Sequence, residues 1–160
     1  MRPSHEAYTT FDIVQKLGIK RDRLNDWLTR GYIQPSIQRA SGQGTKNLFT
    51  RFDLYLIKVF EHMLSRGFSR EVATDKIKSL QEAWKPLPEP RLVPPYVAFG
   101  ETFSRQVREG IHEEKAVRTE VVCVILNDLS EGRLERMKNC DDIYILNFRK
   151  LTGEVNRALK

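Results

Sequence analysis

Cysteine and histidine are scarce in this 160-residue chain. The two cysteines, Cys123 and Cys140, are too few and too isolated for a disulfide framework or a metal-binding cluster, and we expect both to be reduced thiols. The three histidines, His5, His62 and His112, show no ligand spacing. The sequence therefore predicts neither a metal site nor a bound cofactor, although a site assembled from distant residues stays open.

Long apolar runs are also missing. The longest, Val121 to Leu126, is far shorter than a membrane-spanning helix requires. The first ten residues, MRPSHEAYTT, lack the apolar segment of a secretory signal. We therefore expect no membrane association and a cytoplasmic location.

Motifs of known catalytic chemistry are absent as well. The His112-Glu113-Glu114 run lacks the second histidine of a zinc-protease helix, and Gly153 stands without a phosphate-binding loop. Asp141 and Asp142 precede a strand-like segment with no identifiable acidic partner. Solvated surface or helix caps explain these residues better, so we do not expect an enzyme.

What the sequence does contain is a basic excess confined to one half. Residues 1–85 hold 15 Lys and Arg against 9 Asp and Glu, whereas residues 86–160 hold 12 of each. With 40% hydrophobic and 30% charged residues, the chain has the composition of a folded protein of one or two small domains. A basic N-terminal half favours binding to a phosphate backbone, although a merely solvated basic surface is the alternative.

The segment 20–31, KRDRLNDWLTRG, predicts a short helix with two unlike faces. Leu24, Trp27 and Leu28 form one apolar stripe at i, i+3 and i+4. The remaining positions are polar, and Gly31 is placed to end the helix. Such a helix is anchored on one side and exposes hydrogen-bonding groups on the other.

A second short helix is predicted just before it. Thr9 and Asp12 form a capping-box pattern, and an apolar face follows that ends at Gly18 and consists of Phe11, Ile13, Val14 and Leu17. Two short helices joined by residues 18–20 are typical of a helix-turn-helix, whose second helix lies in the DNA major groove. On these residues alone an ordinary helical hairpin is equally compatible.

Further elements follow the helical pair. Segments 37–39 and 46–49, around a turn at Gly42 to Gly44, predict a two-stranded β-hairpin, or wing, with Phe49 packed inward. Another capping box at 50–53 begins a helix that runs to about Arg66. Ser69 caps a fourth helix, whose apolar seam must meet the core or a second subunit and consists of Ala73, Ile77, Leu80 and Trp84.

In order and spacing, these segments resemble the DNA-binding domain of the MerR family of transcriptional regulators. The resemblance covers residues 8–80 and is carried by Tyr8 to Thr10, Leu17 to Ile19, Leu24, Trp27, Gly31 to Ile33, Pro35, Gly44 to Phe49, Asp53-Leu54 and Gly67 to Ser69. It implies a winged helix-turn-helix that reads double-stranded DNA as a homodimer. The residues that we expect to contact DNA are Thr10, Lys20, Arg21, Arg23, Asn25, Thr29, Arg30, Arg39, Lys46, Asn47 and Arg51.

The chain also departs from this family's pattern. Lys20 stands where a Ser or Thr cap is usual, and Asn25 stands where an arginine is usual. Asp22 and Asp26 lie one turn apart on the outer face, where they repel phosphates unless they pair with neighbouring arginines or accept from a cytosine amino group. The sequence preference is therefore expected to be unusual.

The second half predicts a small α+β domain. A proline-rich linker, 86–95, separates residues 1–85 from residues 96–160. Strands are predicted at Tyr96 to Phe99, 120–126 and 142–148, with helices at 129–137 and 151–159. The fold class is thus α+β, with a four-helix winged domain first and no uninterrupted heptad stretch for a dimerising coiled coil.

Three functional hypotheses arise. The first is a sequence-specific, DNA-binding transcriptional regulator, with dimer contacts through the seam of the fourth helix or the C-terminal helix. The second is an architectural DNA-binding protein or protein-docking adaptor without strong sequence preference. The third, an enzyme, has no motif behind it.

Residues 96–160 could also bind a small-molecule or protein effector. Their aromatic residues suit either a pocket or a core, and these are Tyr96, Phe99, Phe103, Tyr144 and Phe148.

Overall fold

The computed structural model describes residues 6–84, 94–107, 114–126 and 135–160. Two compact units emerge, residues 1–74 with 151–160 and residues 75–150, and the divisions between them fall within helices rather than at the predicted linker. Residues 86–93 of that linker lie outside the described part of the chain. No helix within the described residues is long and apolar enough to cross a membrane.

Both predicted capping boxes of the first unit are confirmed. Helix α1 (Thr10–Leu17) begins with the Thr9 side chain accepting from the Asp12 backbone N–H, while Asp12 accepts from the Thr9 backbone N–H at 2.7 Å. Thr50 and Asp53 make the same reciprocal contacts at the start of α3 (Arg51–Ser65). Gly18 ends α1 in the left-handed region, at φ 68°, as the sequence predicted.

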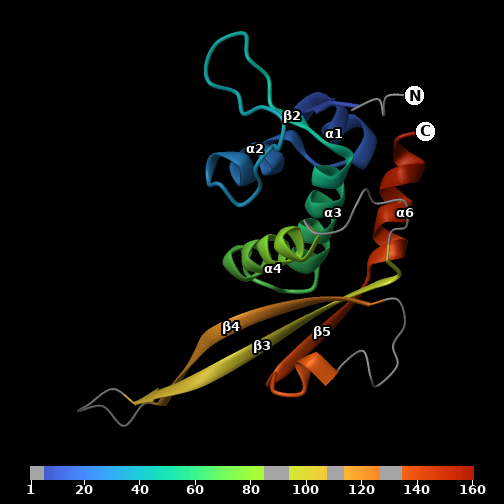
Figure 1. Ribbon diagram of the computed structural model, residues 1–160. Helices are drawn as coiled ribbons and strands as arrows, with labels where there is room; N and C mark the ends of the chain where they lie inside the picture. The colour runs from blue at the N-terminus through green and yellow to red at the C-terminus, as the bar shows by residue number, and fades with distance from the viewer. Residues whose placement is uncertain (1–5, 85–93, 108–113, 127–134) are drawn as a thin grey trace. The chain divides into compact units, whose positions relative to one another are not determined.

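The wing predicted as a two-stranded hairpin is present only in part. Strand β2 (Leu48–Phe49) pairs antiparallel with β1 (Tyr8–Thr9), and only a single bridge, Gln38 with Leu48, closes the intervening loop. The cause is that Phe49 is fully buried, which commits β2 to the core of the unit. Residues 39–47 therefore form a loop closed at its base rather than a ribbon (Figure 1).

Helix α3 is the central helix of the first unit. Eight of its residues are buried, including both Leu54 and Val59, so its apolar surface extends well beyond a single stripe. At its start, buried Asp53 also accepts from the Ser36 backbone N–H at 3.1 Å and from the Ser36 hydroxyl. These two hydrogen bonds hold Ser36, just before the 39–47 loop, against the start of α3. On another part of α3, the Tyr55 hydroxyl donates to Asn156 of α6 (Phe148–Ala158) at 2.8 Å.

The second unit is built on a three-stranded antiparallel sheet in the order β4-β3-β5 (Figure 1). Its strands are β3 (Tyr96–Val107), β4 (Glu114–Leu126) and β5 (Asp142–Asn147). The first two are longer than predicted. A bulge between Thr102 and Phe103 interrupts their register.

The two faces of β3 pack differently, because successive side chains alternate between faces. On one face, Ala98 packs with Met137 of η1 (Glu135–Met137), which is a 3-10 turn. This turn is the end of the segment 129–137 that was predicted to be a helix, and residues 129–134 of that segment lie outside the described residues. On the other face, buried Lys76 of α4 (Arg70–Trp84) pairs with Glu101 at 3.0 Å and lies over the Phe99 ring.

The aromatic residues of this unit serve mainly as core. Phe99 and Phe148 are fully buried, and Phe148 packs edge-on against Trp84 with ring centroids 5.5 Å apart. Phe103, by contrast, is 37% exposed. Cys123 and Cys140 do not form a disulfide, and burial raises the pKa of the Cys123 thiol to about 12. An inert thiol is what such a pKa implies.

Candidate nucleic-acid interface

Helix α2 (Arg21–Thr29) is held by one side only. Leu24 and Trp27 are 0% and 1% exposed, and the Trp27 ring meets the Phe60 ring edge-on at a centroid distance of 4.9 Å. The turn before it is fixed by buried Ile19. Lys20, at the N-cap, makes no side-chain capping bond, as its residue type implies.

The C-terminal end of α2 is fixed by backbone and aromatic contacts. The Trp27 carbonyl accepts from the Tyr32 backbone N–H at 2.9 Å, after Gly31 has turned the chain at φ 74°. The Tyr32 ring stacks on the Phe60 ring with the two centroids 6.2 Å apart, and the Tyr32 hydroxyl donates to Glu71 of α4. These contacts make α2 a rigid platform for its exposed side chains.

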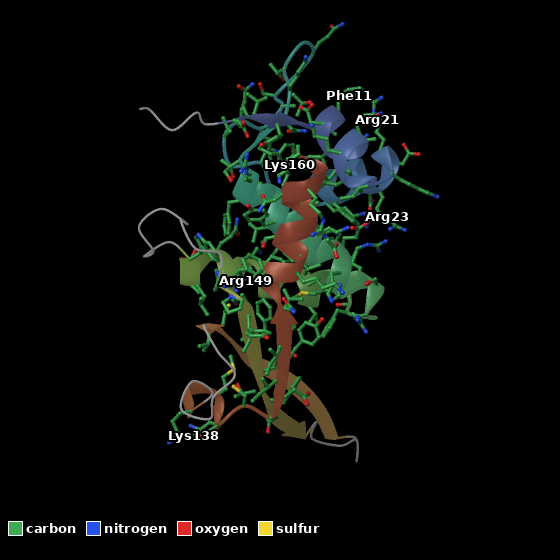
Figure 2. All side chains as sticks on the ribbon, turned by 90° about the vertical axis from the view of Figure 1, so that its right-hand side faces the viewer. Phe11, Arg21, Arg23, Lys138, Arg149 and Lys160 are labelled. Carbon is green, nitrogen blue, oxygen red and sulfur yellow. The ribbon has the colours of Figure 1, made fainter. Side chains whose placement is uncertain are left out.

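The exposed surface of α2 and its N-cap contains every α2 residue predicted to contact DNA. Figure 2 shows Arg21 and Arg23 on the outside of the helical pair, and both are exposed. The full set of exposed candidates here is Lys20, Arg21, Arg23, Asn25, Thr29 and Arg30. A surface of this kind combines cations for phosphates with an amide and a hydroxyl for base edges.

Asp26 is engaged by a neighbour rather than left free on this surface. Its carboxylate lies 2.6 Å from Nε of Arg30, one turn later, and this hydrogen bond raises the pKa of Arg30. An acid on this face was expected to be compatible with DNA if it paired with a neighbouring arginine, and Asp26 makes such a pair. Arg30 is consequently directed in part toward Asp26, which reduces its availability to a phosphate.

Thr10 and Phe11 begin α1 and have different environments. Thr10 is half-buried. Phe11, which the sequence analysis placed on the apolar face of α1, is instead 70% exposed, and that prediction is wrong. In Figure 2 Phe11 lies on the side of the first unit where Arg21 projects. Helical spacing did not predict the exposure of Phe11, because that spacing does not show that a residue at the start of a helix lies beyond the core.

The loop of residues 39–47 is organised by its own polar side chains. Thr45 accepts from the backbone N–H groups of Ser41 and Gly42, and Asn47 accepts from that of Ala40 at 2.8 Å. Asn47 is thus a loop-stabilising residue in this structure. Of the other predicted contacts here, Arg39 and Lys46 are both exposed.

Arg51, at the first position of α3, is already engaged within the unit. Its Nη2 lies 2.6 Å from a Glu6 carboxylate oxygen and 3.4 Å from the Tyr8 hydroxyl. The hydrogen bond from Tyr8, then the one from Arg51, holds the pKa of Glu6 below its ordinary value. Arg51 therefore carries less free positive charge than Arg39 or Lys46.

The N-terminal part of the sequence matches a known protein family. Residues 8–80 match the family described as "MerR HTH family regulatory protein". The segment is a MerR-family helix-turn-helix domain. No curated protein matches the chain.

The MerR-family domain includes all of the elements from β1 to α3 and ends within α4. Its helix-turn-helix is the α1–α2 pair, and the match supports a role in DNA-binding transcriptional regulation. The fold class is confirmed at this level, with helices and two antiparallel sheets in one α+β chain. Residues 81–160 lie outside the match.

Proposed function

We propose that the chain is a sequence-specific regulator that places α2 in the major groove and the 39–47 loop on the flanking phosphate backbone. The observation that supports this most is the division of α2 into a buried apolar side and an outer side on which all its predicted contacts are exposed. The proposal includes no catalytic activity, in line with the absence of a catalytic motif.

The exposed cations divide into two functional groups in this proposal. Arg21 and Arg23 lie on the outer side of α2, where a guanidinium reaches base edges or phosphates. Arg39 and Lys46 lie on the loop, where they contact phosphate. Asn25 and Thr29 add short polar groups for base edges, and Phe11 supplies an apolar contact to the sugar-phosphate backbone. Thr10, Lys20, Arg30, Asn47 and Arg51 are secondary contacts, since three of them are engaged within the protein.

A homodimer is part of the proposal. One helix reads too few base pairs for useful specificity, and dimers present two recognition helices to half-sites about 34 Å apart. A second ligand, a small molecule or a protein, is proposed for residues 96–160, which lie outside the family match.

The test is fluorescence anisotropy with a labelled duplex from the region upstream of the gene and with a scrambled duplex, at several salt concentrations. We expect a preference for the native duplex of at least about 10³-fold. Equal affinity for both duplexes would instead favour an architectural DNA-binding protein.

The Arg23→Ala/Lys46→Ala double variant examines the two proposed contact groups together. It should bind more weakly and show a salt dependence that is flatter by about two counterions. Lys78→Ala/Lys160→Ala, which removes two exposed lysines outside these groups, is the matched control. Unchanged affinity in the Arg23/Lys46 variant would overturn the assignment of α2 and the loop.

A further inference from the structure

The surfaces that the sequence offered for a dimer are largely buried within the chain. In the predicted seam of α4, Ala73, Ile77 and Leu80 are at most 4% exposed, and Trp84 is 7% exposed. In α6, the apolar residues Leu151 and Val155 are buried too. If the protein is a dimer, as the proposed function requires, its interface must lie elsewhere.

Strand β5 has the properties of an unpaired edge. It is an outer strand of the sheet, and among the described residues only β3 pairs with it (Figure 1). Ile143 and Ile145 are 45% and 39% exposed, and they lie on the same face because they stand two residues apart. An apolar strand at the outer edge of a sheet is a template for pairing with another strand.

The charges at the two ends of β5 indicate which strand could pair with it. Asp142 lies at its beginning, whereas Lys150 follows its end, and both are exposed. When two copies of β5 pair antiparallel about a two-fold axis, the acidic end of each meets the basic end of the other. Parallel pairing would place like charges together. The strand is thus complementary to itself in one orientation.

We propose that β5 is the interface between two copies of this chain, which pair antiparallel through it to form one continuous sheet. An axis near Ile145 brings the isoleucines of both copies together on one face of that sheet. Backbone hydrogen bonds supply the pairing, and the end charges fix its direction. This inference rests on the homodimer of the proposed function and assigns its interface.

Sedimentation velocity of the full-length chain over a concentration series tests the interface without DNA. The wild type should be a dimer, and Ile145→Lys should be a monomer, because a lysine on an edge strand opposes pairing. Circular dichroism and thermal unfolding establish that this variant is folded, which its partial exposure permits. Lys78→Glu, an exposed change on α4, is the control and should remain dimeric.

Charge reversal distinguishes self-pairing from a merely structural role of β5. Asp142→Lys sets like charges against each other twice in the symmetric dimer and should raise its dissociation constant about tenfold. Combining it with Lys150→Glu in the same chain should restore the wild-type value. A monomeric wild type, a dimeric Ile145→Lys variant or a double variant no tighter than Asp142→Lys would each overturn the proposal.

The outcomes for interface and function are separable. A monomeric wild type that still prefers its native duplex would refute the β5 interface and leave DNA recognition intact. A dimer disrupted by Ile145→Lys whose wild type binds both duplexes equally would confirm the interface and refute sequence-specific regulation.

Discussion

Replacing Asp26 by Asn should tighten DNA binding. The substitution removes a negative charge from the outer side of α2 and releases Arg30, which Asp26 holds at 2.6 Å. A carboxylate about 8 Å from a phosphate costs about 0.5 kcal/mol at the dielectric constant of water and about 2 kcal/mol at an effective value of 20. The expected gain in affinity is therefore between about twofold and about 30-fold, with the smaller value favoured at high salt.

The same substitution should scarcely affect folding. The Asp26 and Arg30 side chains are 38% and 61% exposed, and an exposed i,i+4 pair contributes little to the free energy of unfolding because water screens it. Affinity and stability thus change by different amounts and in opposite directions. This difference separates an electrostatic effect at the interface from a general effect on the domain.

Anisotropy titrations from about 50 to 200 mM salt measure the effect, and the slope of log affinity against log salt should steepen by about one counterion. Glu154→Gln on α6 removes an equal charge outside the proposed contact groups and serves as the control. Weaker binding of Asp26→Asn to the native duplex would refute the reasoning. A loss confined to that duplex would identify Asp26 as a reader of a base amino group.

Three other predictions concern packing, pH and the exposed aromatic. Gly100→Ala should lower the free energy of unfolding by about 1–3 kcal/mol in denaturant titrations, because its Cβ would overlap Sγ of Cys140, and Cys140→Ala in the same chain should recover most of the loss. Hydrogen bonds from Thr9 hold the pKa of Asp12 below its ordinary value, so ionised Asp12 stabilises the fold above about pH 4 and loses this effect as the pH falls through its lowered pKa. Asp12→Asn should therefore cost about 1 kcal/mol at pH 7 and progressively less as the pH falls through the lowered pKa, and a loss of melting temperature that does not change with pH would contradict the capping role. Phe11→Ser should weaken binding to native and scrambled duplexes alike while leaving the melting temperature unchanged, whereas unaltered affinity would exclude Phe11 from the interface.

The helical part of the fold was predictable because its signals are local. Thr9 with Asp12, and Thr50 with Asp53, are three residues apart and form the capping boxes that the sequence indicated. The glycine after α1 adopts the left-handed conformation for which its lack of a side chain suits it. In each case the interacting groups lie within a few residues, so composition and spacing determine the structure.

Pairings between distant residues were not predictable in this way. Leu48 pairs with Thr9, nearly forty residues earlier, and neither residue carries a pattern that names the other. The ion pair of Lys76 with Glu101 was likewise hidden, since Lys76 lies inside an apolar helix pattern and Glu101 in a strand-like segment. The candidate interface was predictable for α2, where polar residues occupy one side, but not for engaged side chains such as Arg51.

The buried pair of Lys76 and Glu101 limits how this sequence can diverge. Their side chains are 1% and 11% exposed, and Glu101 also pairs with Arg118 at 3.1 Å. Removing Glu101 takes its carboxylate from both cations, and breaking a buried pair in this way costs about 3–5 kcal/mol. Burial alone would raise the pKa of Glu101, but the hydrogen bonds from Lys76 and Arg118 outweigh it and lower the pKa. Because a whole domain is stable by only about 5–15 kcal/mol, a drift at one position is viable only with a matching change at the other. In descendants of this protein, positions 76 and 101 should therefore either keep opposite charges or become apolar together.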